Sequence, residues 1–133
     1  MQDMYKDLMA LARKASENAY APYSGFSVGA CVLFDSGNRY TGVNVENASL
    51  GLSICAERSA IACAVSQGEK GKLRAVAIFA SKQKECLPCG ACRQWVSEFD
   101  SGVVEIIVEG KDSEIVVYKM SELLPNSFKY EQS

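Results

Sequence analysis

The sequence predicts an α/β fold, a three-layer α/β/α sandwich with a mixed five-stranded sheet. Helical and strand-like patterns follow one another along the chain in the order α-β-β-α-β-α-β-β. Strand-helix-strand connections of this kind place helices against the faces of a sheet. Residues 27–34 are apolar on both faces, which is typical of a central strand covered by helices on both sides. At 133 residues we expect one domain over residues 1–133.

The first half of the chain is expected to form a helix, a hairpin and a second helix. Apolar residues recur at helical spacing over about 3–20, and Pro22 and Gly25 end that helix. The strand at 27–34 is followed by a turn at 35–38, rich in Asp, Ser, Gly and Asn. A returning strand at 39–45 completes the hairpin.

The second half of the chain begins with an alanine-rich helix over about 55–67, which ends at Gly68. A short apolar strand at 75–80 follows, and Pro88 stands where a helix over about 89–99 begins. The remaining β-rich runs lie at 103–108 and 115–118, with a turn around Gly110 between them and a short segment after them.

The composition restricts the possible chemistry. The chain has six cysteines and no histidine, so it has no Ser-His-Asp triad and no histidine metal ligand. The net charge is −2, which offers no basic surplus for a nucleic-acid polymer. No segment reads as a signal peptide or a membrane span, so we expect no membrane partner. Free thiols are typical of a reducing compartment, and we expect a cytoplasmic protein.

Three cysteines stand at predicted helix starts. Cys55 is followed by Ala56 and Glu57, and Cys89 and Cys92 form a Pro-Cys-x-x-Cys motif. The positive end of a helix dipole favours the thiolate, the form of cysteine that binds a metal. If the two helix starts meet, three thiolates converge and leave a fourth position open, as in a catalytic zinc site. Glu57 would then lie beside that position without ligating, in the arrangement of zinc-dependent base deaminases.

Two other interpretations of these cysteines stay open at this point. The Cys-x-x-Cys pair is compatible with a thioredoxin-like redox protein, which would need neither Cys55 nor Glu57. A closed structural zinc site would need a fourth ligand, and Cys86 could supply it. Cys31 lies within a predicted strand and Cys63 within a predicted helix, where buried packing is expected for both.

The chain resembles the small cytidine deaminases of the three-cysteine zinc type over nearly its whole length. The matching segments are 22–30 (PYSGFSVGA), 42–48 (GVNVENA), 55–58 (CAER), 88–94 (PCGACRQ) and 123–128 (LLPNSF). The resemblance implies hydrolytic deamination of cytidine and 2′-deoxycytidine to the uridines with release of ammonia, as in pyrimidine salvage. It also implies one Zn²⁺ per subunit and a homotetramer with composite active sites.

The resemblance also assigns roles to individual residues. Cys55, Cys89 and Cys92 would hold the zinc, and Glu57 would carry protons. Phe26 would pack on the pyrimidine, and Asn44 and Glu46 would bind the ribose hydroxyls. The backbone of Ala56 would meet the base, Phe128 would reach over from another subunit, and Gln94 would support the site.

Arg58 and Leu50 need separate comment. Three thiolates on Zn²⁺ leave a net negative charge, and Arg58 could donate to the ligand sulfurs and withdraw some of it. Leu50 stands where close relatives usually have an aromatic residue, which affects the expected subunit contact rather than the chemistry. The alternative functions are a deaminase of another aminopyrimidine nucleoside such as blasticidin S, and a non-catalytic, zinc-stabilised binding module.

Overall fold

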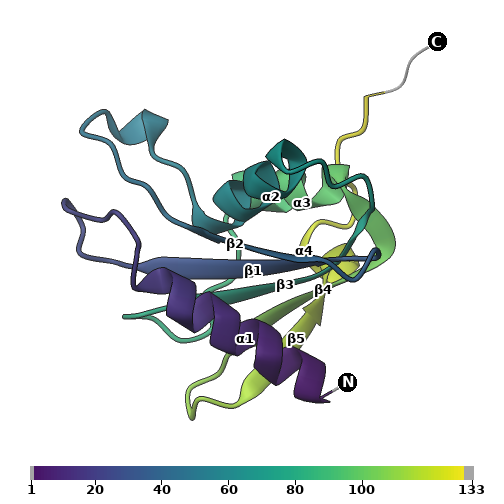
Figure 1. Ribbon diagram of the computed structural model, residues 1–133, viewed down its shortest axis with the longest axis horizontal. Coiled ribbons are helices and arrows are strands. Elements are labelled where there is room, and N and C mark those ends of the chain that lie inside the picture. The colour runs from purple at the N-terminus through teal and green to yellow at the C-terminus, as the bar shows by residue number, and fades with distance from the viewer. Residues whose placement is uncertain (1, 131–133) are drawn as a thin grey trace.

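The computed structural model describes residues 2–130 and contains one five-stranded mixed sheet between two layers of helices (Figure 1). The strands run in the order β2-β1-β3-β4-β5, and only β3 and β4 pair in parallel. The α/β/α sandwich with a mixed five-stranded sheet predicted from the sequence is confirmed. The strands are β1 (Val28–Phe34), β2 (Arg39–Val43), β3 (Leu73–Ala80), β4 (Asp100–Glu109) and β5 (Ile115–Lys119).

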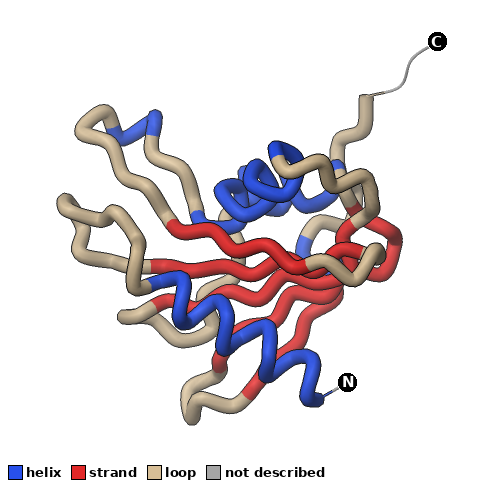
Figure 2. Tube along the Cα trace, viewed as in Figure 1, coloured by secondary structure: helices blue, strands red, loops and turns tan. Residues whose placement is uncertain are grey.

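The helices lie on opposite faces of the sheet. Helix α1 covers one face, and α2 and α3 lie side by side on the other (Figure 1; helices blue in Figure 2). Two short helical segments, η1 and α4, complete the structure. The bounds are α1 (Gln2–Ser16), η1 (Leu50–Leu52), α2 (Ala56–Ser66), α3 (Gly90–Glu98) and α4 (Met120–Leu123).

The sheet has a separate apolar core on each face, and β1 contributes to both. Ala30, Val32 and Phe34 pack under α2 and α3, whereas Cys31 and Leu33 pack under α1. This is the two-sided burial that its sequence predicts, because alternate residues of a strand point to opposite faces. Both helical layers are therefore fixed to one central strand.

The predicted first helix is too long: α1 ends at Ser16, not near residue 20. The Ser16 hydroxyl donates to the Arg13 carbonyl oxygen at 2.6 Å, a local bond that competes with continued helix. Tyr20 instead pairs with the chain after β2, since its N–H donates to the Asn44 carbonyl at 3.0 Å and its carbonyl accepts from Glu46 N–H. Tertiary pairing of the backbone thus overrides the helical pattern.

Two glycines let backbones approach one another closely. A Cβ on Gly42 of β2 would lie 2.7 Å from the Ala56 carbonyl oxygen, so α2 rests directly on β2. A Cβ on Gly29 of β1 would meet the backbone of Ser16 at the end of α1. The first contact matters for function, because α2 begins beside Cys55.

Within residues 2–130, we find no helix whose length and apolar character would suffice to cross a membrane.

Candidate metal centre

Three cysteine sulfurs converge on the side of the sheet covered by α2 and α3. The Sγ atoms of Cys55, Cys89 and Cys92 all lie within 4.8 Å of one another, and Cys55 Sγ is 4.0 Å from Cys89 Sγ. A tetrahedral zinc ion with Zn–S bonds of about 2.3 Å holds its sulfurs about 3.8 Å apart. The three sulfurs therefore fit one zinc ion and leave one tetrahedral position for water or substrate.

The starts of two helices place these sulfurs. Cys55 is the N-cap residue of α2, Cys89 is the N-cap residue of α3, and Cys92 lies one turn further along α3. Neither N-cap side chain makes a capping hydrogen bond, so both sulfurs stay available as ligands. The positive ends of both helices also favour thiolates at these positions. This is the convergence of helix starts that the sequence predicts.

The hydrogen bonds among these groups favour a thiolate at Cys55. The Cys92 thiol and the Arg58 guanidinium lower the pKa of Cys55 to about 5. The same hydrogen bond, together with burial, raises the pKa of Cys92, so the first negative charge is concentrated at Cys55. Arg58 Nη2 lies 3.3 Å from Cys55 Sγ. This contact agrees with the expectation that Arg58 donates to a ligand sulfur.

Glu57 lies beside the sulfurs but is separate from their cluster. Its side chain is only 5% exposed, and burial raises the pKa of its carboxyl group. It lines a cavity of about 280 Å³ together with Cys55 and Cys89. A buried carboxyl group that faces such a cavity can exchange protons with a bound molecule. The other lining residues are Val28, Asn44, Glu46, Ser53, Ile54, Ala56, Ile78, Cys86 and Leu87.

Asn44 and Glu46 reach the cavity from the segment after β2, and both also hold neighbouring backbone. The Asn44 side chain accepts from Val28 N–H at 2.9 Å and donates to the Phe26 carbonyl at 2.8 Å. Glu46 accepts from the amides of Tyr23 and Ser24 at 3.0 and 3.1 Å and from the Ser24 hydroxyl. These bonds fix the direction of both side chains, and the hydroxyl bond lowers the pKa of Glu46.

Phe26 and Phe128 do not line this cavity within one chain. Phe26 is half-buried next to Asn44. Phe128 is 71% exposed near the C-terminus, where its carbonyl oxygen accepts from Gln94 Nε2 at 2.9 Å. Gln94 thus holds the C-terminal segment against α3, and the Phe128 ring is free to contact another molecule.

Two more residues lie near the sulfurs: Cys86, which the sequence offered as a possible fourth ligand, and Arg93, to which the sequence assigned no role. Cys86 lines the cavity but is not a member of the sulfur cluster, so the closed four-cysteine alternative is not supported. Arg93 Nε donates to the Pro88 carbonyl at 2.8 Å, and its Nη1 donates to the Leu123 carbonyl at 3.0 Å. Arg93 therefore anchors the chain directly before Cys89. Its place one turn after Cys89 is the sequence signal that could have indicated this role.

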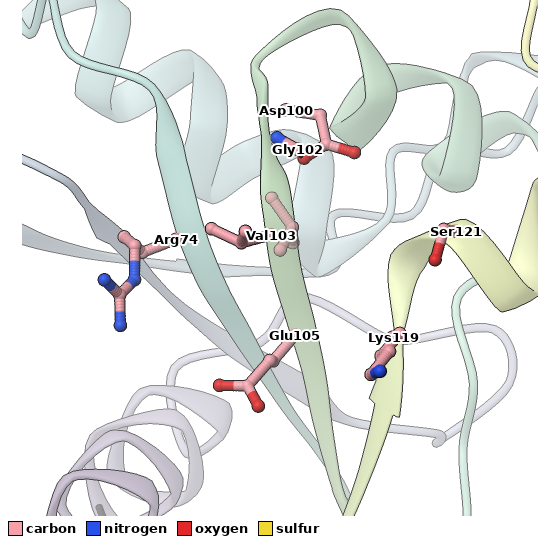
Figure 3. Close-up of a pocket in the computed structure, with 8 residues that line it drawn as sticks. Arg74, Asp100, Gly102, Val103, Glu105, Lys119 and Ser121 are labelled. Carbon is pink, nitrogen blue, oxygen red and sulfur yellow. Dashed lines mark hydrogen bonds between the residues drawn. The ribbon is translucent and has the colours of Figure 1, made fainter.

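A larger hollow of about 540 Å³ lies over the first half of β4 (Figure 3). Arg74, Glu105 and Lys119 project from three adjacent strands around it. Both Glu105 oxygens accept from the Tyr5 hydroxyl at 2.8 Å, so this carboxylate links α1 to the sheet. The hollow shares no lining residue with the cavity of Glu57 and contains no cysteine. The chemistry therefore belongs to the smaller cavity.

Comparison with known proteins gives one consistent result. A family model described as "Cytidine and deoxycytidylate deaminase zinc-binding region" matches residues 2–109. A cytidine deaminase of Sporosarcina psychrophila is 40% identical over 124 residues, which cover 93% of this chain and 90% of that protein. The crystal structure of cytidine deaminase from Burkholderia pseudomallei has a TM-score of 0.85 and 39% identity, covering 92% of this chain and 98% of that one. The cytidine deaminase structure from Mycobacterium tuberculosis has a TM-score of 0.82 and 36% identity, covering 95% and 98%.

Proposed function

This chain belongs to the zinc-dependent cytidine deaminases, and we propose that it hydrolyses cytidine and 2′-deoxycytidine to the uridines with release of ammonia. The observation that carries the proposal is the place of Glu57. It is buried, lies in the cavity of Cys55 and Cys89, and has a raised pKa. A carboxyl group in this position can move protons between water and a bound base without histidine. We take residues 1–133 as one catalytic domain, supported by the single sheet that joins both halves of the site.

Cys55, Cys89 and Cys92 would hold one zinc ion per subunit, in keeping with the fit of their sulfur positions. When bound there, zinc lowers the pKa of water so that a hydroxide nucleophile is available near neutral pH. Arg58, which contacts Cys55 Sγ, would reduce the negative charge that three thiolates place on the metal. Arg58 would thus offset negative charge that neutral histidine ligands would not bring to the metal.

In the proposed reaction, Glu57 accepts a proton from the attacking water and delivers it to N3 of the pyrimidine. The water oxygen forms a bond to C4, which becomes tetrahedral. Glu57 then transfers the second water proton to the amino group. The C4–N4 bond breaks, ammonia leaves, and C4 becomes the carbonyl carbon of uridine. The low exposure of Glu57 supports this shuttle, because burial raises the pKa of its carboxyl group and so favours its taking up a proton.

The substrate would lie in the cavity of about 280 Å³. Asn44 and Glu46 would bind the ribose hydroxyls, since an amide can donate to and accept from a diol and a carboxylate can accept from it. The Ala56 backbone would meet the base, and Phe26 would pack on the pyrimidine from the segment that Asn44 holds. Gln94 would support the site by fixing the segment that carries Phe128.

We propose a homotetramer with composite sites. Exposed apolar side chains on η1, α3 and the C-terminal segment support self-association, and the most exposed of them are Tyr130 at 78% and Leu50 at 75%. Phe128 would contact the cavity of a neighbouring subunit, which explains why it lies outside the cavity of its own chain. Leu50 replaces the usual aromatic residue at this contact with aliphatic bulk. With six free thiols, the protein suits the reducing cytoplasm.

The test is ammonia release by the purified protein from cytidine, 2′-deoxycytidine and blasticidin S, with zinc counted per subunit. We expect turnover of both nucleosides and one zinc per chain. The matched control is Glu57→Gln, which should keep its zinc and lose at least about a hundredfold in turnover, since the shuttle and not a ligand is removed. Turnover of blasticidin S and of neither nucleoside would identify the antibiotic as the substrate instead. Zinc binding without any turnover would indicate a binding module.

A further inference from the structure

A buried carboxylate with two partly exposed cationic partners lies at the end of β4. Glu109, the last residue of β4, is 7% exposed and forms ion pairs with Arg13 of α1 and with Lys84 of the loop before α3. Lys84 Nζ is 3.1 Å from Glu109 Oε1 and 3.0 Å from Ser113 Oγ. A buried carboxylate requires such partners, and here it joins three separate parts of the chain.

The backbone of the next loop residue is fixed to the same point. Glu85 N–H donates to the Glu109 carbonyl oxygen at 2.6 Å, and the Tyr118 hydroxyl donates to the Glu85 carboxylate at 3.3 Å. Glu85 has φ of 51°, a left-handed conformation that is unfavourable for a residue other than glycine, asparagine or aspartate. Such a conformation persists where surrounding contacts impose it. The contacts to β4 and β5 do so here.

The chain reaches the metal centre directly after this point. Cys86 and Leu87 line the cavity, and Cys89 supplies a sulfur to the cluster. Arg93 holds the Pro88 carbonyl at the far end of the same stretch. The segment 85–88 is therefore held at both ends, and its first anchor is the Lys84–Glu109 pair.

We propose that Lys84 and Glu109 are positioning residues: they fix the loop 84–89 on the end of β4 and so set Cys89 and the cavity wall against Cys55 and Glu57. The catalytic part of this inference rests on the proposed function, whereas the metal part does not. Displacing a reacting group by about 1 Å can reduce a rate about a hundredfold. Residues that orient metal ligands typically contribute about 10- to 100-fold to metal affinity.

The two cations of Glu109 offer a matched comparison. Lys84→Met and Arg13→Met each remove one partner of the same carboxylate, and their side chains are similarly exposed at 42% and 53%. Lys84 belongs to the loop of Cys89, whereas Arg13 belongs to α1 on the other face of the sheet. A purely structural role of Glu109 predicts similar effects of both changes. Positioning predicts that Lys84→Met alone affects the site.

The experiment uses the zinc-loaded protein and measures zinc transfer to a chromogenic chelator, kcat and KM for cytidine, and the melting temperature. We expect Lys84→Met to release zinc about tenfold faster and to lower kcat/KM about tenfold. Lys84→Arg should restore both quantities. Arg13→Met should change the melting temperature as much as Lys84→Met does, but not the zinc release. Tyr118→Phe, which frees only the Glu85 side chain, should move zinc release in the direction of Lys84→Met.

Equal zinc release from Lys84→Met, Arg13→Met and the parent protein would overturn the inference, as would equal acceleration in both variants. Zinc release requires no substrate. If the parent protein fails to deaminate cytidine, the proposed function fails while zinc release still decides the role of Lys84.

Discussion

Replacing Arg58 with alanine tests the charge balance of the metal centre. Arg58 Nη2 contacts Cys55 Sγ at 3.3 Å, and its Nε is buried with no hydrogen-bond partner among the described residues. The hydrogen bond to Cys55 Sγ is thus the main polar contact that holds the guanidinium in place. A hydrogen bond to a charged acceptor contributes about 1.5–3 kcal/mol. Because Arg58 is only half-buried, solvent screens its charge, and we take the lower end of this range.

A loss of about 1.5 kcal/mol corresponds to about a tenfold change in an equilibrium or rate constant. We therefore expect Arg58→Ala to lower kcat for cytidine, or the affinity for zinc, by about tenfold. Arg58→Lys should recover part of the loss, since it keeps the charge but loses the planar fork. Steady-state ammonia release and zinc titration against a competing chelator measure the two quantities. Arg74→Ala, an exposed arginine on β3, is the matched control and should leave both unchanged. Unaltered turnover together with unaltered zinc affinity in Arg58→Ala would refute the reasoning.

Two further predictions concern the scaffold. Gly42→Ala should push α2 away from β2, lower the free energy of unfolding by about 1–3 kcal/mol and accelerate zinc loss. Urea denaturation measures the stability, and the control is Gly51→Ala, where an added Cβ would meet nothing within 4 Å. Glu69 accepts from the Gly71 amide and from Asn38, Tyr40 and Ser36, which lowers its pKa to about 2. Its stabilising effect is complete above the unfolded pKa near 4.5 and is lost as pH falls through the folded pKa of about 2. Glu69→Gln should therefore lower the melting temperature at pH 7, and its difference from the parent should shrink below pH 4.5 and vanish only below about pH 2. A difference that persists at low pH, or a Glu17→Gln control with the same profile, would contradict this.

The elements best predicted from the sequence are those whose pattern is local. The strand β1 follows from its continuous apolar run, which is buried on both faces, and the start of α2 follows from the cysteine that precedes it. The end of α1 does not follow from local pattern, because Tyr20 pairs with residues more than twenty positions away. The sheet order also depends on contacts between distant segments, yet the strand-helix-strand crossovers restricted it strongly.

The three cysteines of the sulfur cluster and Glu57 stand out in the sequence because the proposed chemistry requires those residue types at fixed spacing. The residues that hold the site in position are harder to predict from the sequence. Arg93 binds a carbonyl thirty residues away in Leu123, and Lys84 meets a carboxylate twenty-five residues further along the chain. The sequence does not indicate which distant residue a charged loop residue will pair with, since most lysines are simply exposed to solvent. Only the folded chain shows that Lys84 stands at the base of the Cys89 loop.

The metal centre joins two parts of the structure that are anchored independently. Cys55 and Glu57 belong to α2, which rests on β2 through Gly42, at one edge of the sheet. Cys89 and Cys92 belong to α3, whose approach is tied to β4 and β5 through Glu85 and Glu109 near the other edge. Helix α2 packs much more extensively on β2 and β1 than on α3. Zinc bound to all three sulfurs would therefore add a direct link between the starts of α2 and α3, which already share one apolar core. Because the chain has no histidine, its metal site depends on the relative position of the starts of α2 and α3. Contacts near opposite edges of the sheet hold these two helix starts in place.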